Sequence, residues 1–450
     1  MIRVFSVHAW WNPLLSLLIL FGAHLMYGAN SSAYAMLFTS LSFAICIISL
    51  VTTRDSVKIL ATAEFMLVLG LFTLTVLILS LQLTPFLPDW PHPFWDWTNS
   101  NAVITLDKDA TVREIMKLSG LGALFITGLL AGENHNRAKL LFEFMTLAGA
   151  AFAIWAFVVY VSQANEAPNG QIKSSLRLAA NFGSANSAAS LFGILGLLAL
   201  ASIFRKSKKI TNHDNKLSWF AENLINQLPT ALIALIFSLT SLLLTGSRTG
   251  NLAAIIAFSS FVLWEFLSAK RRANASQGLA GPFVVLFLLL ALVFYISDDL
   301  LFLRLERSTL QSGLRIDMIS VHWQAFLNAP WLGYGMGTFY HVNAMLMNSQ
   351  NWNSINTIGA VHNLYVQWLE EAGIIGTASM FTLIAVILRT TLSGLRRRRR
   401  MRTMFRALIC ISLFLLLHGM LDYGLQVPSI AMTWALLLGT GFGMATAKNR

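Results

Sequence analysis

Charged side chains are scarce in this chain of 450 residues, of which Asp, Glu, Lys and Arg together make up only 12%. An ordinary globular domain is roughly 25% charged, so a soluble protein of this composition could not cover its surface with polar groups. The scarcity excludes a soluble enzyme and a soluble nucleic-acid-binding domain, although the net charge is +12. Cysteine is also rare. Cys46 and Cys410 both lie in apolar runs, which argues against a disulfide framework and against a zinc site.

Long apolar runs recur along the whole chain, and hydrophobic residues make up 56% of it. A run of about 20 apolar residues is long enough to cross roughly 30 Å of hydrocarbon as a helix. We therefore expect an all-α, polytopic integral membrane protein with a single membrane domain over residues 1–450. Ala33-Tyr34-Ala35 resembles a signal-peptide cleavage site, so cleavage after the first span stays an open alternative. Twelve spans are predicted, at residues 11–28, 33–51, 59–83, 115–132, 138–161, 183–204, 229–245, 250–268, 279–297, 366–390, 406–421 and 428–446.

Lysine and arginine are distributed unevenly among the connections between these spans. If the N-terminus is cytoplasmic and the spans alternate, most of the 32 Lys and Arg residues fall on the inner side, including the run Arg396 to Arg400. Because loops rich in positive charge stay in the cytoplasm, we predict that both termini are cytoplasmic. The longest outer connection, residues 298–365, is too long for a passive connector. It is predicted to contain an amphipathic helix over 298–328, ended by Ala329-Pro330, and then a turn-rich stretch with glycines at 333, 335 and 337.

Arginines on the outer side are the first candidates for chemistry. Arg248 stands between two glycines in Thr245-Gly-Ser-Arg-Thr-Gly250, where two spans meet. An arginine close to hydrocarbon is costly and usually has a partner or a ligand, and the flanking glycines let backbone amides approach an anion. The alternative is an interfacial arginine that reaches lipid phosphate. Arg315 and Asp317 lie on the helix of the outer loop, either in a site or on a solvated face with local ion pairs.

His362 and Asn363 stand where the long loop re-enters the membrane. A lone histidine is most often structural, but the neighbours of this one favour a site. Tyr365 and Trp368 have aromatic faces suited to sugars, and the glutamates at 370 and 371 are placed to orient or pair with the cations. Neutral imidazole is a suitable general base for a hydroxyl near neutral pH.

Two further groups belong to the same predicted side. Arg177 precedes a stretch of small residues at the outer end of the sixth span and is a third candidate cation, whereas the small residues themselves are typical of close helix packing. His418 and Asp422 lie four residues apart, and therefore on one helical face. They either line the cavity of the site or form a structural polar pair.

Two other classes of site are disfavoured. Asp298-Asp299 is a weak signal for the metal of a nucleotide-sugar transferase, because nucleotide sugars are made in the cytoplasm and this pair is predicted to lie outside. The sequence has no glycine-rich phosphate loop followed by Lys and Ser or Thr, so we expect no ATP-driven pump.

The candidate residues on the outer side predict one kind of reaction. Arginines bind phosphates bidentately and can stabilise a departing diphosphate, and the histidine can accept a proton from a hydroxyl. Together, the arginines, the histidine and the aromatic residues predict glycosyl transfer from a lipid diphosphate, with no metal and no cofactor.

The motifs, taken in order, resemble the bacterial O-antigen ligase and O-antigen polymerase superfamily of polytopic membrane glycosyltransferases. The resemblance covers residues 177–425, whereas the first 160 residues match only as generic spans. It rests on Thr-Gly-Ser-Arg248-Thr-Gly, on Arg315-x-Asp317 followed by Pro330, Gly333, Gly335 and Gly337, and on the pattern His362-Asn363, nine residues, Gly373, two residues, Gly376.

The resemblance implies a donor glycan carried on undecaprenyl pyrophosphate, in the bacterial inner membrane, with the active site facing the periplasm. It also implies that Arg248 and Arg315 hold the diphosphate and that His362 activates the acceptor. The candidates for substrate binding are Arg177, Asn363, Tyr365, Asp317 and Asp422, of which Arg177, Tyr365 and Asp422 have no firm match in the family pattern.

The acceptor is open, because the superfamily has three branches. Ligases transfer O-antigen to lipid A-core, polymerases join repeat units of O-antigen, capsule or exopolysaccharide, and a third branch transfers glycans to protein hydroxyls. The complete His-Asn pattern favours a ligase in lipopolysaccharide biosynthesis. A different class, a flippase for lipid-linked glycans or a secondary transporter, has the same layout of spans. It is disfavoured because the two halves show no repeat and the polar residues gather at one face.

Overall fold

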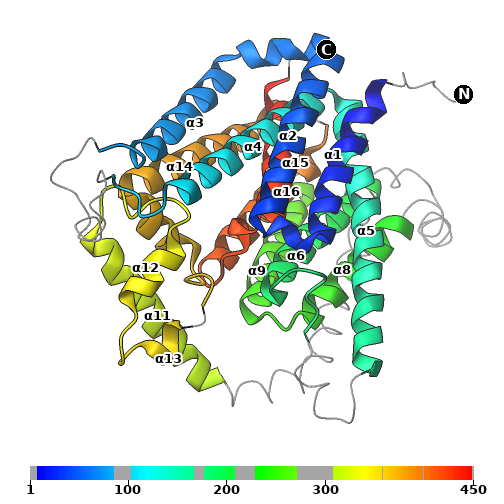
Figure 1. Ribbon diagram of the computed structural model, residues 1–450. Helices are drawn as coiled ribbons and strands as arrows, with labels where there is room; N and C mark the ends of the chain where they lie inside the picture. Colours follow the sequence, from blue (N-terminus) through cyan, green and yellow to red (C-terminus); the bar gives the residue numbers. More distant parts are fainter. Residues whose placement is uncertain are drawn as a thin grey trace, which may run out of the picture.

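The structure, a computed structural model, describes residues 8–85, 103–166, 177–207, 229–270, 308–356, 358–398 and 400–447. Over these ranges the regular structure is entirely helical (Figure 1), which confirms the predicted all-α class. Nine helices within the described ranges are long and apolar enough to cross a membrane. They are α2 (Ser32–Thr52), α3 (Ala63–Leu81), α4 (Lys108–Glu133), α5 (His135–Glu166), α6 (Ala185–Ser207), α9 (Arg248–Lys270), α14 (Leu364–Arg397), α15 (Arg402–Gly419) and α16 (Pro428–Thr446).

Two shorter apolar helices complete the match with the predicted spans. They are α1 (His8–Leu25) and α8 (Pro229–Leu244). Eleven of the twelve predicted spans therefore coincide with described helices, while the predicted span 279–297 lies outside the described residues. The total of twelve stays a prediction. Short 3-10 helices, η1 (Tyr27–Ala29), η2 (Arg54–Ala61) and η5 (Gly424–Gln426), connect some of these elements.

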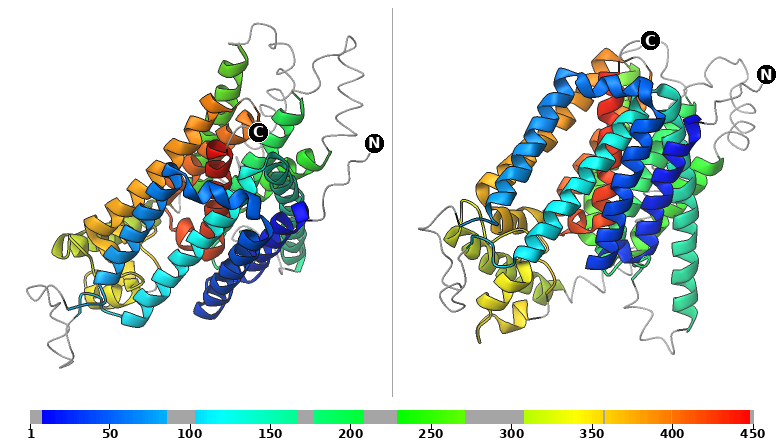
Figure 2. Two further views of the ribbon diagram at one scale, coloured as in Figure 1. Left: turned by 90° about the horizontal axis from the view of Figure 1, so that it is seen from above. Right: turned by 45° about the horizontal axis from the view of Figure 1, so that its top comes forward.

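The helices form a bundle in which α1 begins and α16 ends at the same end (Figure 1). The helices of the long loop, α11 (Ser308–Asn328), α12 (Phe339–Leu346) and α13 (Trp352–Ile355), gather at the other end. Helices α3 and α14 lie side by side along one flank in both views of Figure 2. This arrangement agrees with alternating spans, and the side of the membrane on which each end lies stays a prediction.

Helices α4 and α16 pack closely against each other, and glycines permit the close approach. A Cβ atom on Gly128 would lie 2.2 Å from the carbonyl oxygen of Leu436, and one on Gly439 would lie 2.0 Å from that of Phe125. Small residues at such an interface let two backbones pack closely where no hydrophobic driving force acts between helices in lipid. The crossing fixes the depth and direction of α16 relative to α4.

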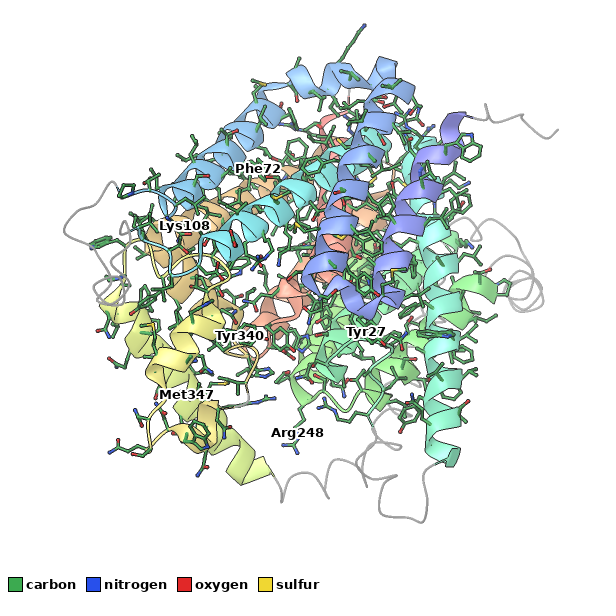
Figure 3. All side chains as sticks on the ribbon, in the orientation of Figure 1. Tyr27, Phe72, Lys108, Arg248, Tyr340 and Met347 are labelled. Carbon is green, nitrogen blue, oxygen red and sulfur yellow. The ribbon has the colours of Figure 1, made fainter. Side chains whose placement is uncertain are left out.

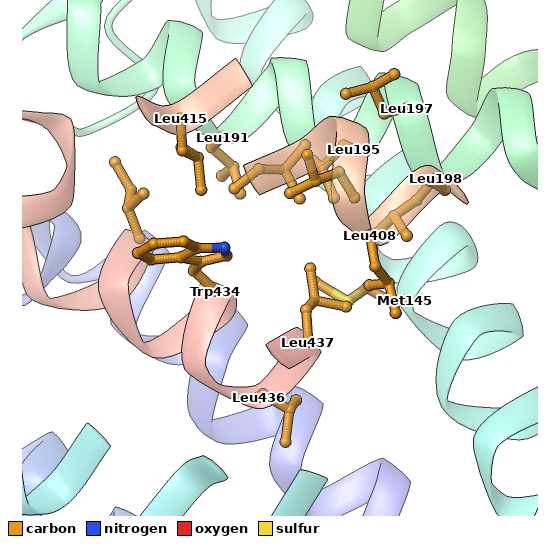
Figure 4. Packing of buried hydrophobic residues seen from close by; sticks show 14 of the residues in the cluster. Met145, Leu191, Leu195, Leu197, Leu198, Leu408, Leu415, Trp434, Leu436 and Leu437 are labelled. Atoms are coloured by element: carbon orange, nitrogen blue, oxygen red, sulfur yellow. The ribbon is translucent and has the colours of Figure 1, made fainter. Parts of the chain in front are cut away.

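The centre of the bundle is filled by aliphatic side chains around Trp434 (Figure 4). Leu191 and Leu195 of α6 and Leu408 of α15 belong to this cluster, and each is at most 3% exposed. The indole N–H of Trp434 donates to the hydroxyl of Ser412 at 3.0 Å, so its one polar group is satisfied in the apolar interior. Among the described spans α6 is the most completely buried, and α5, α8, α9 and α15 pack against it.

The long loop follows the predicted pattern in the part that is described. Helix α11 ends at Asn328, immediately before Ala329-Pro330, as predicted, whereas the first ten residues of the predicted helix lie outside the described ranges. Gly333, Gly335 and Gly337 have φ angles of 67°, 106° and 78°. These are left-handed conformations that glycine adopts without strain, so the turn-rich prediction is confirmed.

Candidate functional site

His362 is the last residue but one before α14, and its backbone φ is 53°. The adjacent Asn363 caps the helix, because its side-chain oxygen accepts hydrogen bonds from the backbone N–H groups of Tyr365 and Val366 at 3.0 and 3.1 Å. A cap of this kind fixes where the helix begins. The His-Asn pair is thus a unit in which the asparagine positions the histidine at the entrance of the span. Asn363, predicted to bind substrate, is used by the helix itself.

Asp422 is completely buried and lies between two histidines. Its Oδ1 is 3.5 Å from Nδ1 of His362, and its Oδ2 is 3.6 Å from Nε2 of His418. The far nitrogen of His418 contacts the hydroxyl of Ser190 at 3.0 Å. The side chain of His362 is 26% exposed and that of His418 only 2%, so only His362 can meet a substrate. The structure therefore joins the two predicted residues His362 and Asp422.

The charge of Asp422 is stabilised by its surroundings. Burial alone would raise the pKa of this carboxyl, but the contacts with His362 and His418 and the backbone N–H of Tyr423, which donates at 2.7 Å, hold the pKa below its ordinary value. A buried anion beside Nδ1 of His362 favours a proton on that nitrogen. The other ring nitrogen, Nε2, is then left as a proton acceptor.

Tyr423 joins this pair to a cavity. Its ring centroid lies 5.0 Å from that of His362 in an edge-on arrangement. Burial, and after it the charge of Asp422, raise the pKa of the Tyr423 phenol, so this group is neutral at physiological pH. Tyr423 also lines a cavity of about 460 Å³. The polar and charged residues around that cavity include Arg113, Glu114, Lys117, Tyr340, Gln367, Glu371 and Gln426.

Arg113 and Lys117 are cations that sequence analysis did not single out. They lie four residues apart near the start of α4 and so share one face of the helix. In the sequence they read as the ordinary charged flank of an apolar span, because the first 160 residues carry no motif of the resemblance. The only signal in the sequence was the four-residue spacing of Arg113 and Lys117. That spacing becomes informative once the structure shows that both residues line a cavity.

The two glutamates after Trp368 serve the structure and do not pair with the predicted arginines. Glu370 is buried, and its Oε2 lies 2.5 Å from Nδ1 of His322 on α11. Glu371 accepts hydrogen bonds from the backbone N–H of Gly337 at 3.0 Å and from the side chain of Gln367 at 3.1 Å. The expectation that these carboxylates would pair with the cation cluster is therefore wrong. His322, which the sequence analysis also missed, is the partner of Glu370.

The glycine-rich turn of the long loop is seated on a break in α14. Gly373 has φ 61° and ψ −176° and interrupts the helix. At the break the carbonyl oxygens of residues 370 and 371 accept hydrogen bonds from the backbone N–H groups of Tyr334 and Gly335 at 2.9 and 3.0 Å. In return, Ile374 donates its backbone N–H to Pro330 at 2.7 Å. The glycines of the two sequence patterns thus form one joint, which ties the loop to the span that carries His362.

The predicted arginines have different surroundings. Arg248 is the first residue of α9, is exposed, and lies at the same end of the bundle as the long loop, with its side chain projecting out of the bundle (Figure 3). Arg177 donates from Nε to the carbonyl oxygen of Thr245 at 2.6 Å and from Nη2 to Asn186 at 2.7 Å. It therefore holds the turn that leads to Arg248. This position supports a structural role for Arg177 beside the predicted one.

Arg315 and Asp317 are both exposed on α11. Neither side chain forms an ion pair with another described residue, so the local pairs considered as an alternative are not found in this part of the chain. The meeting of Arg248, Arg315 and His362 in one cavity stays a prediction, since the contacts link His362 to Asp422 and Tyr423.

One face of the Tyr365 ring is occupied by Phe381, with centroids 5.4 Å apart and planes 6° apart. The hydroxyl of Tyr365 donates to the carbonyl oxygen of Leu416 at 2.8 Å. Trp368 is tilted against the same phenylalanine and also lines the cavity. Sugar stacking by these two aromatic residues stays a prediction. Among the described residues, no group of three or more His, Cys, Asp or Glu side chains is arranged to hold a metal ion.

Comparison with known proteins bears on the same region. No curated protein matches the chain. Residues 233–381 match a family model described as O-antigen ligase. The match contains Arg248, Arg315, His362 and the joint at Gly373, and it leaves Arg177 and Asp422 outside. It supports the resemblance to the O-antigen ligase and polymerase superfamily that the sequence motifs indicate.

Proposed function

We propose that this protein is a membrane glycosyltransferase that moves a glycan from an undecaprenyl-pyrophosphate-linked donor to an acceptor hydroxyl at the periplasmic face of the bacterial inner membrane. The observation that carries the proposal is the partly exposed His362 beside the buried anion of Asp422. His362 lies within the segment that matches an O-antigen ligase family. A partly exposed histidine beside a carboxylate, in ring contact with a tyrosine that lines a cavity, is suited to accept a proton from a hydroxyl.

The reaction follows from this arrangement. Nε2 of His362 takes the proton of the acceptor hydroxyl as its oxygen bonds to the anomeric carbon of the donor sugar. The bond from that carbon to the phosphate oxygen breaks, and the lipid diphosphate leaves with the electron pair. Asp422 stabilises the imidazolium that forms. Arg248 and Arg315 are the candidate cations for the diphosphate, because planar guanidinium groups bind phosphate bidentately. No metal or cofactor takes part in this scheme.

The acceptor favoured by the complete His-Asn pattern is lipid A-core, which makes the protein an O-antigen ligase of lipopolysaccharide biosynthesis. The second candidate is a polymerase that joins repeat units, or a transferase to protein hydroxyls, since all three need the same donor chemistry. Similarity to the family supports the identity of the donor better than the identity of the acceptor. A flippase or transporter would have no use for a general base at this position.

The test uses a deletion strain of the host, complemented with variants, in which the length of undecaprenyl-linked glycans is measured. His362→Ala should fail to complement, whereas His135→Ala should complement fully, because His135 is an exposed histidine at the opposite end of the bundle. Both variants must insert to wild-type levels.

Each result of the deletion identifies a branch. Long chains on the carrier with bare lipid A-core identify a ligase, and single repeat units on the carrier identify a polymerase. Normal lipopolysaccharide with unglycosylated protein identifies the protein-transfer branch. An unchanged lipid-linked pool, or full complementation by His362→Ala, would refute the proposed function.

A further inference from the structure

The cavity lined by Tyr423 adjoins a second, apolar one. The second cavity has a volume of about 160 Å³ and lies between α3, α4, α14 and α16. Leu118, Leu121, Trp368, Met380, Leu425 and Ala431 line both cavities. The residues that line only the second are deeper in the spans and almost all apolar, among them Val68, Phe72, Phe125 and Trp434. The two cavities are therefore adjacent, a charged one and an apolar one, with these six residues between them.

The charged cavity carries two cations near the start of α4. Arg113 is half-buried, lines the cavity, and makes no hydrogen bond or ion pair with any described residue. Lys117, one turn deeper, forms an ion pair with Glu114. A lysine ammonium has three donors, so Lys117 keeps donors for a second anion while it contacts Glu114. The other acid of the cavity, Glu371, is already engaged by Gly337 and Gln367.

We propose that Arg113, Lys117 and the adjoining apolar cavity bind a polyprenyl diphosphate, with its diphosphate at the two cations and the start of its single chain between α3, α4, α14 and α16. An unpaired arginine near hydrocarbon indicates a ligand, and an anionic headgroup complements it. An apolar cavity of about 150 Å³ takes a molecule the size of benzene. The apolar cavity therefore fits a short section of one chain, and a lipid with several acyl chains does not fit it.

The proposed lipid site lies next to His362, the proposed general base. Tyr423 and Gly359 line the charged cavity, and Tyr423 contacts His362. A sugar attached to a diphosphate at Arg113 and Lys117 would extend toward that wall of the cavity. The identification of the lipid as the glycan carrier rests on the proposed function, whereas the binding itself does not depend on catalysis. Neither Arg248 nor Arg315 lines this cavity, so the site on α4 is separate from the one that the arginines of the family motifs would form.

The test is the binding of undecaprenyl diphosphate to the purified full-length protein in detergent, measured by native mass spectrometry. Arg113→Gln with Lys117→Gln should lower the affinity at least about tenfold, because hydrogen bonds to charged groups are lost. Ala431→Trp, which narrows the junction of the two cavities with both cations intact, should lower it as well. Arg396→Gln with Arg397→Gln removes the same charge from exposed positions at the far end of α14 and should leave the affinity unchanged.

Three results would overturn the inference. The first is wild-type affinity in the Arg113 and Lys117 double variant. The second is a loss of affinity in Arg248→Gln with Arg315→Gln but not in the α4 variant. The third is displacement of undecaprenyl diphosphate by equal amounts of phosphatidylglycerol or lipid A, which would make the site a general anionic-lipid site. His362→Ala should bind like wild type. If the α4 variant loses binding as expected but no form of the protein transfers glycan, the proposed function fails and the site stands.

Discussion

Gly373 offers the sharpest test of how the long loop is tied to the span that carries His362. It is the residue at which α14 is interrupted, with φ 61° and ψ −176°. A Cβ atom there would lie 2.3 Å from both the carbonyl carbon and the carbonyl oxygen of Trp331, and 2.5 Å from the backbone nitrogen of Leu332. These are backbone atoms, so no side-chain rotation relieves the clash. Gly373→Ala must therefore separate the loop from the helix or reshape the break.

The magnitude follows from two costs. A non-glycine residue in this region of φ and ψ costs about 1–3 kcal/mol, and overpacking of a tight contact costs about 1–3 kcal/mol more. We expect Gly373→Ala to lower the free energy of unfolding by about 2–6 kcal/mol and to reduce glycan transfer, because the joint that positions the start of α14 is lost. The measurement is the Tm of the purified protein in detergent, together with transfer activity in membranes.

Gly70→Ala is the matched control. A Cβ atom at Gly70 of α3 meets nothing within 4 Å, and alanine is favoured over glycine in a helix by about 0.5–1 kcal/mol. This variant should keep or slightly raise the Tm. A Gly373→Ala protein with wild-type Tm and activity, or a Gly70→Ala protein as damaged as Gly373→Ala, would refute the reasoning.

Three further predictions concern charge and titration. Asp422→Asn should lower the rate of glycan transfer. The decrease should be smaller than the roughly 10²–10⁴-fold that loss of a general base such as His362 costs. An unchanged kcat and an unchanged pH–rate profile would contradict the role of Asp422. Arg406 and Glu265 form a buried ion pair at 2.8 Å between α15 and α9, so Arg406→Met should destabilise the protein by about 3–5 kcal/mol. The double variant with Glu265→Gln should recover most of the Tm, and failure to do so would mean that the pair is not the cause. Burial, and then the charge of a neighbouring glutamate, raise the pKa of Tyr334 to about 12. The contribution of the neutral Tyr334 phenol to the free energy of unfolding should be complete below its ordinary pKa of 10.0 and lost as the pH rises toward 12. A difference titration at 295 nm against Tyr334→Phe measures the pKa of this phenol. Titration of Tyr334 near pH 10 would contradict the prediction.

The spans were accessible from the sequence because each depends on a local property. Eleven predicted spans coincide with described helices, since a run of apolar residues of sufficient length decides its own partition into hydrocarbon. The end of α11 at Asn328 was equally local, because a proline two residues later stops the helix. The left-handed glycines after it followed from their spacing alone.

The site could be predicted only in part. The histidine was found from its neighbours, and Asp422 was a candidate from its spacing to His418. The contact of Asp422 with His362, however, joins the start of α14 to the end of α15, 60 positions along the chain. Glu370 was misassigned for the same reason. Its partner, His322 on α11, depends on how α11 packs against α14, which residue type and local spacing do not encode.

The sequence by itself determined the membrane class, the spans, the end of the loop helix and the motifs that name the superfamily, because hydrophobic length, helix breakers and glycine conformations are properties of short segments. Tertiary structure alone decided which polar groups meet. It placed Asp422 behind His362, seated the glycine turn on the break at Gly373, and turned Arg113 toward a cavity. These outcomes depend on the crossing of α4 with α16 and of α14 with α15, where the shape of many distant side chains fixes the depth and rotation of each helix.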